Sequence, residues 1–201
     1  MMKSGSLSFD SGDVVLERDC GTHKAAVLCG GACGEKAARL TAEALAGLLS
    51  FGFERCMTDQ PAELWREAAD LIAEALAGAG EAGAGLSAWT MMAAAMDQQG
   101  RWCLFHLGEG LAMGKTAPGR DWAVLSRPQR DLLPGGAGQT ADSAMYGGLR
   151  FCRQVHPADR GLILMSDGAL ERFRAAPPLL QAKALPEGAG SMAWLMTLPE
   201  L

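Results

Sequence analysis

The strongest candidates for chemistry in this chain follow directly after an apolar stretch. Residues 162–165 are apolar, and Ser166, Asp167 and Gly168 come next. A carboxylate at the point where a buried strand stops can ligate a hard divalent cation. The same pattern also suits a structural role, in which the aspartate caps a following helix or makes a turn. The sequence pattern alone leaves both roles open for Asp167.

Thiols and imidazoles give a second, weaker set of candidates. The six cysteines are scattered without a CxxC pair, which predicts buried, reduced thiols. Cys29 and Cys33 lie four residues apart, so a reactive thiol or a soft-metal site at these two residues is the alternative. His23 and His106 could act as bases only if the fold brings them to the reacting group.

Composition excludes several classes of function. The chain has 201 residues and a net charge of −5, with no basic cluster, so nucleic acid is not an expected partner. No apolar run reaches the roughly 18 residues of a membrane-spanning helix, and the N-terminus lacks the apolar core of a secretory signal. We therefore expect one domain over residues 1–201, in the cytoplasm, without a membrane partner.

Hydrophobic periodicity and turn residues predict the elements that would position these residues. Two helices are expected, over about residues 35–50 and from residue 59 or 60 to the glycines at 78 and 80. A short helix is expected from Ala169, and the Gly-rich residues 131–149 are expected to form a flexible flap or insertion. The predicted strands are residues 12–18, 23–28, 88–96, 101–107, 110–115, 122–125, 162–165 and 192–198, with a hairpin loop at 97–100.

The order of these elements predicts the fold class. The long helices follow the first pair of strands, and the later strands form a meander, which favours antiparallel sheets over a doubly wound parallel sheet. The expected class is α+β, with two mainly antiparallel sheets flanked by helices.

Six short segments also follow one another in a familiar order. They are residues 11–13, 26–38, 85–88, 105–109, 161–169 and 192–198. Together they resemble the metal-dependent protein phosphatases of the PPM or 2C type, including the stage II sporulation protein E branch. The most specific segment is the apolar strand that ends in Ser166, Asp167 and Gly168. The resemblance implies a four-layer α-β-β-α sandwich, in agreement with the pattern of elements.

The resemblance also implies a chemistry, the hydrolysis of phosphoserine or phosphothreonine by water that two Mn²⁺ or Mg²⁺ ions activate. By this comparison Asp13 and Asp167 are the catalytic metal ligands, and Gly30 offers its backbone carbonyl. Glu109 stands where the family has an aspartate. Cys29 occupies the place of the aspartate that would bridge the two metals, and a soft thiol suits neither Mn²⁺ nor Mg²⁺.

Further departures from the family pattern lie near the ends of the site. Gly190 and Ser191 stand where one or two aspartates are usual, and Arg18 lies on the wrong side of Asp13 for a phosphate-binding arginine. If Glu35 replaces Cys29 as a ligand, the loss is smaller. We therefore expect a degenerate member that binds a phosphoprotein or another signalling protein, with an active Mn²⁺- or Mg²⁺-dependent phosphatase of reduced ligand set as the alternative.

Overall fold

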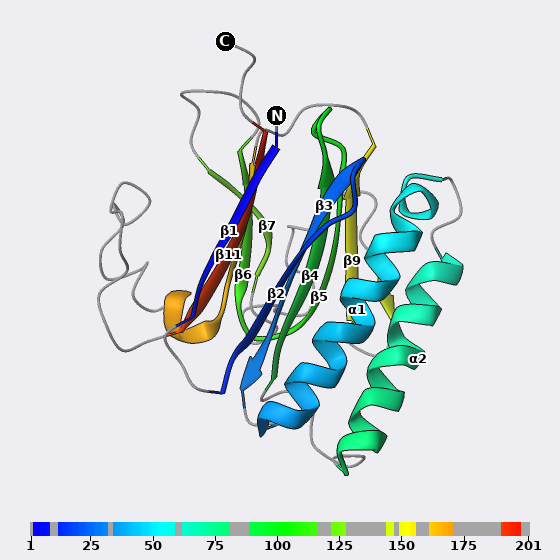
Figure 1. Ribbon diagram of the computed structural model, residues 1–201, viewed down its shortest axis with the longest axis vertical. Coiled ribbons are helices and arrows are strands. Elements are labelled where there is room, and N and C mark those ends of the chain that lie inside the picture. The colour runs from blue at the N-terminus through cyan, green and yellow to red at the C-terminus, as the bar shows by residue number, and fades with distance from the viewer. Residues whose placement is uncertain are drawn as a thin grey trace.

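Two antiparallel β-sheets pack face to face, and two long helices cover the outside of one of them (Figure 1). This arrangement is that of a computed structural model. It describes residues 2–8, 12–31, 34–58, 62–80, 89–115, 122–127, 144–146, 149–155, 161–170 and 190–197.

The six-stranded sheet contains, in order of pairing, β2 (Val14–Asp19), β3 (His23–Gly31), β4 (Trp89–Asp97), β5 (Trp102–Gly108), β9 (Leu149–Gln154) and β8 (Ala144–Tyr146). The five-stranded sheet contains β1 (Met2–Ser8), β11 (Ser191–Thr197), β10 (Gly161–Met165), β6 (Leu111–Lys115) and β7 (Ala123–Ser126). The strands β1 and β11, the first and last along the chain, are paired along their whole length, so Met2 lies opposite Thr197.

The central strands β3 and β4 are buried on both faces, which explains their continuous run of small apolar residues. Side chains alternate between the two sides of a strand. In β3, Val27 and Cys29 pack in the core between the sheet and the helices, whereas Ala26 and Leu28 pack in the core between the two sheets. The alternation of β3 therefore decides which layer each of its residues faces.

The helices α1 (Gly34–Cys56) and α2 (Ala62–Ala79) lie on the outer face of the six-stranded sheet (Figure 1). Ala38, Ala42, Leu45 and Leu49 of α1 recur at helical spacing and are fully buried. Small alanines at this face let α1 lie close to β3. None of the described helices has the length and apolarity needed to cross a membrane.

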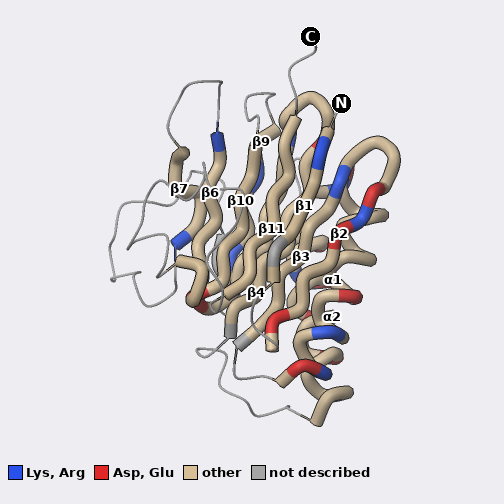
Figure 2. The backbone as a smooth tube through the Cα atoms, turned by 60° about the vertical axis from the view of Figure 1, so that its left-hand side comes forward, with Lys and Arg blue, Asp and Glu red and all other residues tan. Residues whose placement is uncertain are grey.

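The outer face of the five-stranded sheet is also apolar. Ile163 and Met165 of β10 cluster there with Ala169 and Leu170, which belong to a helical turn over residues 167–170. This turn, orange in Figure 1, lies at the lower end of the sandwich. The start of β1 and the end of β11 lie at the upper end. Charged residues are concentrated on α1, α2 and the strand ends, and the middles of the strands are largely uncharged (Figure 2).

The antiparallel sandwich predicted from the sequence is confirmed, and several boundaries change. The first helix continues to Cys56, six residues beyond its predicted end. The strand β1 was not predicted, and neither was β9. Residues 144–146 form the short strand β8 within the stretch predicted as a flap or insertion. Residues 131–143 and 147–148 lie outside the described residues, so the flap stays a prediction.

A polar cluster interrupts the apolar core between the sheets. The His106 imidazole is fully buried, and its Nδ1 lies 2.6 Å from Ser126 Oγ and 3.1 Å from Arg150 Nη2. Arg150 also donates a hydrogen bond to the backbone carbonyl of Arg127. Burial, and then the neighbouring charge of Arg150, hold the pKa of His106 well below its ordinary value of 6.5. The imidazole is therefore neutral in the folded protein near pH 7.

We expect the free energy of unfolding to decrease as the pH is lowered from about 7 to 5. The pKa of His106 is depressed in the folded state, so the unfolded chain takes up the proton first, near its ordinary value of 6.5. The decrease should approach about 1.4 kcal/mol per pH unit, the limit for one proton. Urea unfolding at a series of pH values measures it.

The variant His106→Gln retains a polar side chain but cannot titrate. Its unfolding free energy should lose this slope between pH 5 and 7, whatever its stability at pH 7. An equal slope in the variant would show that another group controls the pH dependence.

Candidate functional site

The strand ends next to Asp13, Gly30, Asp167 and Gly190 lie at one end of the sandwich, the lower end in Figure 1. Asp13 comes just before β2, and β2 begins opposite the end of β3, because Val14 pairs with Cys29. In the other sheet, β10 ends where β11 begins, because Met165 pairs with Met192. Residues from four separate parts of the chain therefore lie at neighbouring strand ends.

Asp13 and Gly30 are in direct contact. A Cβ atom built on Gly30 would lie 1.7 Å from Oδ1 of Asp13, so the carboxylate occupies the space that any larger side chain would need. By the alternation of β3, this contact lies on the face toward the five-stranded sheet. The structure thus brings together two residues that the sequence had assigned to one site; their role as metal ligands stays a prediction.

Cys29 points the other way. Its side chain is 1% exposed and packs with Val27, Ala37 and Ala38 in the core beneath α1. Its neighbour Gly30 faces the opposite side of the sheet, where the Asp13 carboxylate lies. The thiol is therefore a core group. A carboxylate at position 29 would be attached to backbone that faces this apolar layer. Cys33, the other half of the proposed soft-metal pair, lies outside the described residues.

Ser166 and Ser191 bind each other twice at the end of the five-stranded sheet. The Ser166 backbone N–H donates to the carbonyl oxygen of Ser191 at 2.9 Å, and the Ser191 N–H donates to Ser166 Oγ at 2.7 Å. Ser191 Oγ also lies 2.9 Å from Ser8 Oγ at the end of β1. Both Ser166 and Ser191 are buried, whereas the neighbouring Asp167 is half-buried.

Gly190 lies directly against the helical turn that begins at Asp167. A Cβ atom on Gly190 would lie 2.1 Å from the backbone nitrogen of Ala169 and 2.8 Å from Ser166 Oγ. Its φ of +78° also falls in the left-handed region that favours glycine. An aspartate at this position would require the turn over residues 167–170 to move.

Glu109 and the histidines have neighbours of their own. Glu109 lies in the turn between β5 and β6, close enough to Arg150 that its charge counteracts the lowering of the Arg150 pKa by burial. His106 belongs to the same buried cluster. His23 stacks on Phe53 with ring centroids 4.6 Å apart, and it lies at the start of β3, the opposite end of that strand from Gly30. Arg18 is exposed on β2.

A two-metal centre would need several oxygen ligands that converge. Within the described ranges, no three His, Cys, Asp or Glu side chains come together in a way that could hold a metal ion. Asp13 and Asp167 supply hard ligands, but Cys29 is buried in another layer and Gly190 has no side chain. Among the described residues, these groups do not assemble the ligand cluster of the metal pair that the resemblance implies.

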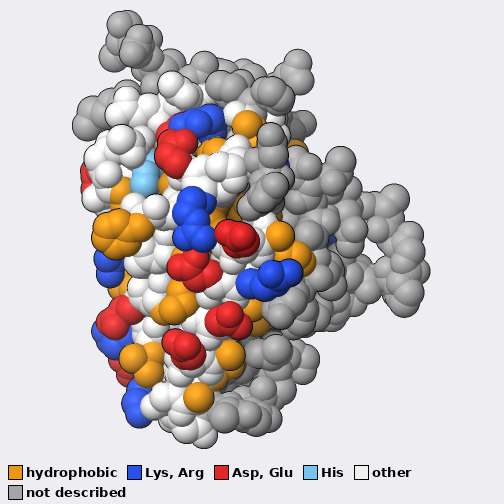
Figure 3. Space-filling model, turned by 90° about the vertical axis from the view of Figure 1, so that its right-hand side faces the viewer, with side chains coloured by type: hydrophobic (Ala, Val, Ile, Leu, Met, Phe, Trp, Pro, Cys, Tyr) orange, Lys and Arg blue, Asp and Glu red, His pale blue; other side chains and the backbone are white. Residues whose placement is uncertain are grey.

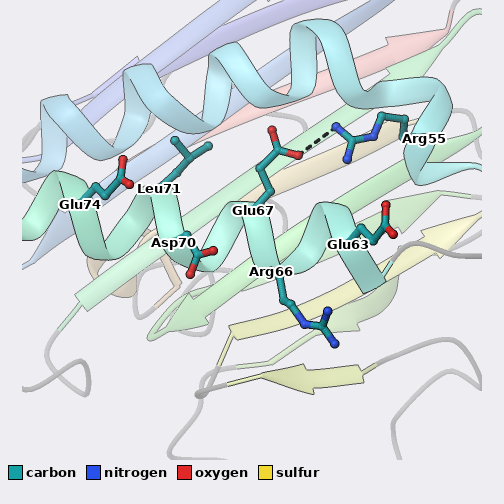
Figure 4. Close-up of a pocket in the computed structure, with 7 residues that line it drawn as sticks. All are labelled: Arg55, Glu63, Arg66, Glu67, Asp70, Leu71 and Glu74. Atoms are coloured by element: carbon teal, nitrogen blue, oxygen red, sulfur yellow. Dashed lines mark hydrogen bonds and ion pairs between the residues drawn. The ribbon is translucent and has the colours of Figure 1, made fainter.

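A shallow groove of about 420 Å³ lies elsewhere, along α2 (Figure 4). Acidic and basic side chains alternate on this face with hydrophobic ones between them (Figure 3). Arg55 and Glu67 form an exposed ion pair of 2.9 Å across the two helices. The groove is lined by Arg55, Glu63, Arg66, Glu67, Asp70, Leu71 and Glu74, and it contains none of the predicted site residues.

Two features of this end could not be found by sequence reasoning. The hydrogen bonds of Ser8 and Ser166 to Ser191 join residues 183 and 25 positions apart. The buried Arg150 gave no signal either, because an arginine in a short strand usually marks a solvent-exposed face. The Gly190 and Ser191 positions were visible only as missing aspartates.

Known proteins support this description of the fold. The phosphatase domain of the cell fate determinant SpoIIE from Bacillus subtilis has a TM-score of 0.53 at 16% identity, over 98% of this chain and 91% of that one. A stage II sporulation E family protein from Thermanaerovibrio acidaminovorans has a TM-score of 0.54 at 20% identity, over 92% and 100% of the two chains. A bacterial serine phosphatase carrying a single arginine substitution has a TM-score of 0.60 at 15% identity, over 100% and 99%.

At such low identities these structures establish the fold alone. A comparison with curated protein sequences finds no match. The family description of protein phosphatase 2C, however, matches residues 26–191, which is most of the chain and includes both long helices and the strands from β4 to β10. The chain therefore belongs to the protein phosphatase 2C family.

Proposed function

We propose that this chain is a phosphatase 2C domain that has lost hydrolysis and acts by binding a protein partner in a bacterial signalling pathway. The observation that carries the proposal is the fate of two ligand positions. Cys29 is packed into the core beneath α1, and Gly190 is packed against Ala169. Neither residue has a side-chain oxygen to serve as the ligand that the family pattern expects there.

The physical argument concerns charge. Two divalent cations a few ångströms apart need several carboxylates to offset their repulsion and to bridge them. Asp13 and Asp167 are the carboxylates that the family pattern matches here. Glu109 interacts electrostatically with Arg150, and this interaction competes with the binding of a cation by Glu109. A thiol at position 29 adds a soft ligand that Mn²⁺ and Mg²⁺ disfavour.

The loss of metal also changes what this end of the sandwich can bind. Without cations, Asp13 and Asp167 present negative charge, which repels a phosphate group. We therefore favour a partner that is recognised through its protein surface over one recognised through a phosphoserine. The partner class rests on the family and on the bacterial phosphatases of similar fold, whose names describe a serine phosphatase and a cell fate determinant.

The alternative is a working phosphatase with a reduced ligand set. The contact between the Asp13 carboxylate and Gly30 favours it, because it keeps one acidic group and one backbone carbonyl position together at the expected place. This alternative requires Mn²⁺ or Mg²⁺ to occupy a site with fewer carboxylates, at correspondingly lower affinity.

We expect p-nitrophenyl phosphate hydrolysis by the wild type to show no saturable dependence on Mn²⁺ up to millimolar concentration, because the bridging ligand is absent. The matched control is Asp167→Asn, which removes a carboxylate that both hypotheses place at the site. Equal rates for the two proteins support the proposal. A Mn²⁺-dependent rate about tenfold or more above that of the variant would establish the phosphatase and refute it.

We also expect free phosphoserine at millimolar concentration to leave the backbone amide resonances of Asp13, Gly30 and Asp167 unshifted, with or without Mn²⁺. The reason is the negative charge of the Asp13 and Asp167 carboxylates at this end. NMR titration measures the shifts, with sodium chloride at equal ionic strength as the control. Shifts that require Mn²⁺ would instead reveal an occupied metal site.

A further inference from the structure

The ligand positions of the family lie on four strand ends, so a metal bound there would also tie those ends together. Asp13 precedes β2, and Cys29 and Gly30 lie among the last three residues of β3. Asp167 follows β10, and Gly190 precedes β11. A chain without the metal must fix these ends through its own hydrogen bonds, because unpaired backbone groups at a buried strand end are costly.

We propose that hydrogen bonds among Ser8, Ser166 and Ser191, the serine bracket, fix the end of the five-stranded sheet without the help of a bound metal. This inference rests on the proposed loss of metal binding. It makes this end of the domain a structural joint whose strength does not depend on divalent cations.

The bracket continues the strand pairing beyond its regular end. The last regular pair between β10 and β11 is Met165 with Met192. One residue further, the Ser166 N–H reaches the carbonyl of Ser191, and the Ser166 hydroxyl accepts from the Ser191 N–H. The hydroxyl thus takes the place of a backbone carbonyl as the acceptor for the fully buried Ser191 amide.

The bracket also joins the neighbouring elements. Ser8, at the end of β1, pairs with Ser191 in the ladder and through its hydroxyl. The carbonyl of Ser166 accepts the hydrogen bond from the Leu170 N–H that closes the helical turn. Three strand ends and one turn therefore meet at two buried serines.

Gly190 and Cys29 are part of the same arrangement. Gly190 lets the backbone before β11 lie against Ala169, which brings the Ser191 amide to Ser166 Oγ. Cys29 fills the core beneath α1. Both former ligand positions now serve packing, so a carboxylate restored at either one disturbs the structure before it can bind a cation.

The first test measures the dependence of the melting temperature on metal. The wild type should melt at the same temperature in EDTA, in Mn²⁺ and in Mg²⁺, because no bound cation stabilises the folded state. A rise in melting temperature that saturates with Mn²⁺ would overturn the proposed function itself.

The second test concerns the bracket alone. Ser166→Ala leaves the buried Ser191 amide without its acceptor, so the melting temperature should fall by about 3–8 °C in a domain of this size. Ser4→Ala, the same substitution on β1 away from the bracket, should change it by less than about 2 °C. Equal effects of the two substitutions would overturn the bracket while leaving the loss of hydrolysis intact.

Hydrogen exchange covers the case in which Ser166→Ala does not fold. In the wild type, the Ser191 amide should be protected as strongly as the amides of the β10–β11 ladder, and EDTA should not change its exchange rate. Fast exchange of this amide in the wild type would overturn the bracket.

The third test restores carboxylates. Cys29→Asp and Gly190→Asp, singly and together, should each lower the melting temperature by about 5 °C or more, and added Mn²⁺ should not restore it. The matched controls are Cys29→Ser and Gly190→Ala, which add no charge. A Mn²⁺-dependent recovery in either aspartate variant would show that the ligand positions are still usable, and the packing argument would be wrong.

Discussion

The double burial of β3 is the constraint on which the rest of the structure depends. The strand lies between the helices on one side and the second sheet on the other, so each residue belongs to one of two cores. Cys29 falls on the helix side and Gly30 on the sheet side, next to the Asp13 carboxylate. Because side chains alternate along a strand, two consecutive residues of β3 face different layers: one packs in the core, and the next faces the Asp13 carboxylate.

This constraint gives a physical account of how a phosphatase fold can lose its chemistry and keep its shape. The sandwich is stabilised by apolar layers that do not include Asp13, Glu109 or Asp167. A ligand position that faces such a layer can take an apolar side chain at little cost, and one in a turn can become glycine. Hydrogen bonds between serines then satisfy the backbone at the strand ends.

The sequence predicted the local features and missed the distant ones. The hairpin loop after β4 is as expected, because Asp97 and the residues that bind its carboxylate are within four positions. The strand β1 was missed because its partner β11 lies at the other end of the chain, and β9 because Arg150 points into the core. The resemblance implies an aspartate at position 29, so the thiol there could be noted from the sequence. The layer into which Cys29 packs could not, because it depends on which residues of β3 face the helices.

The pairing of β1 with β11 has a consequence for synthesis of the chain. Met2 lies opposite Thr197, and β11 is the strand between β1 and the rest of the five-stranded sheet. The strand β1 leaves the ribosome before the other strands of this sheet and is among the last to find its place, since the chain up to residue 197 must emerge first. Closing a loop of this length is slow, and until it closes, β1 is an unpaired edge that can pair with another nascent chain.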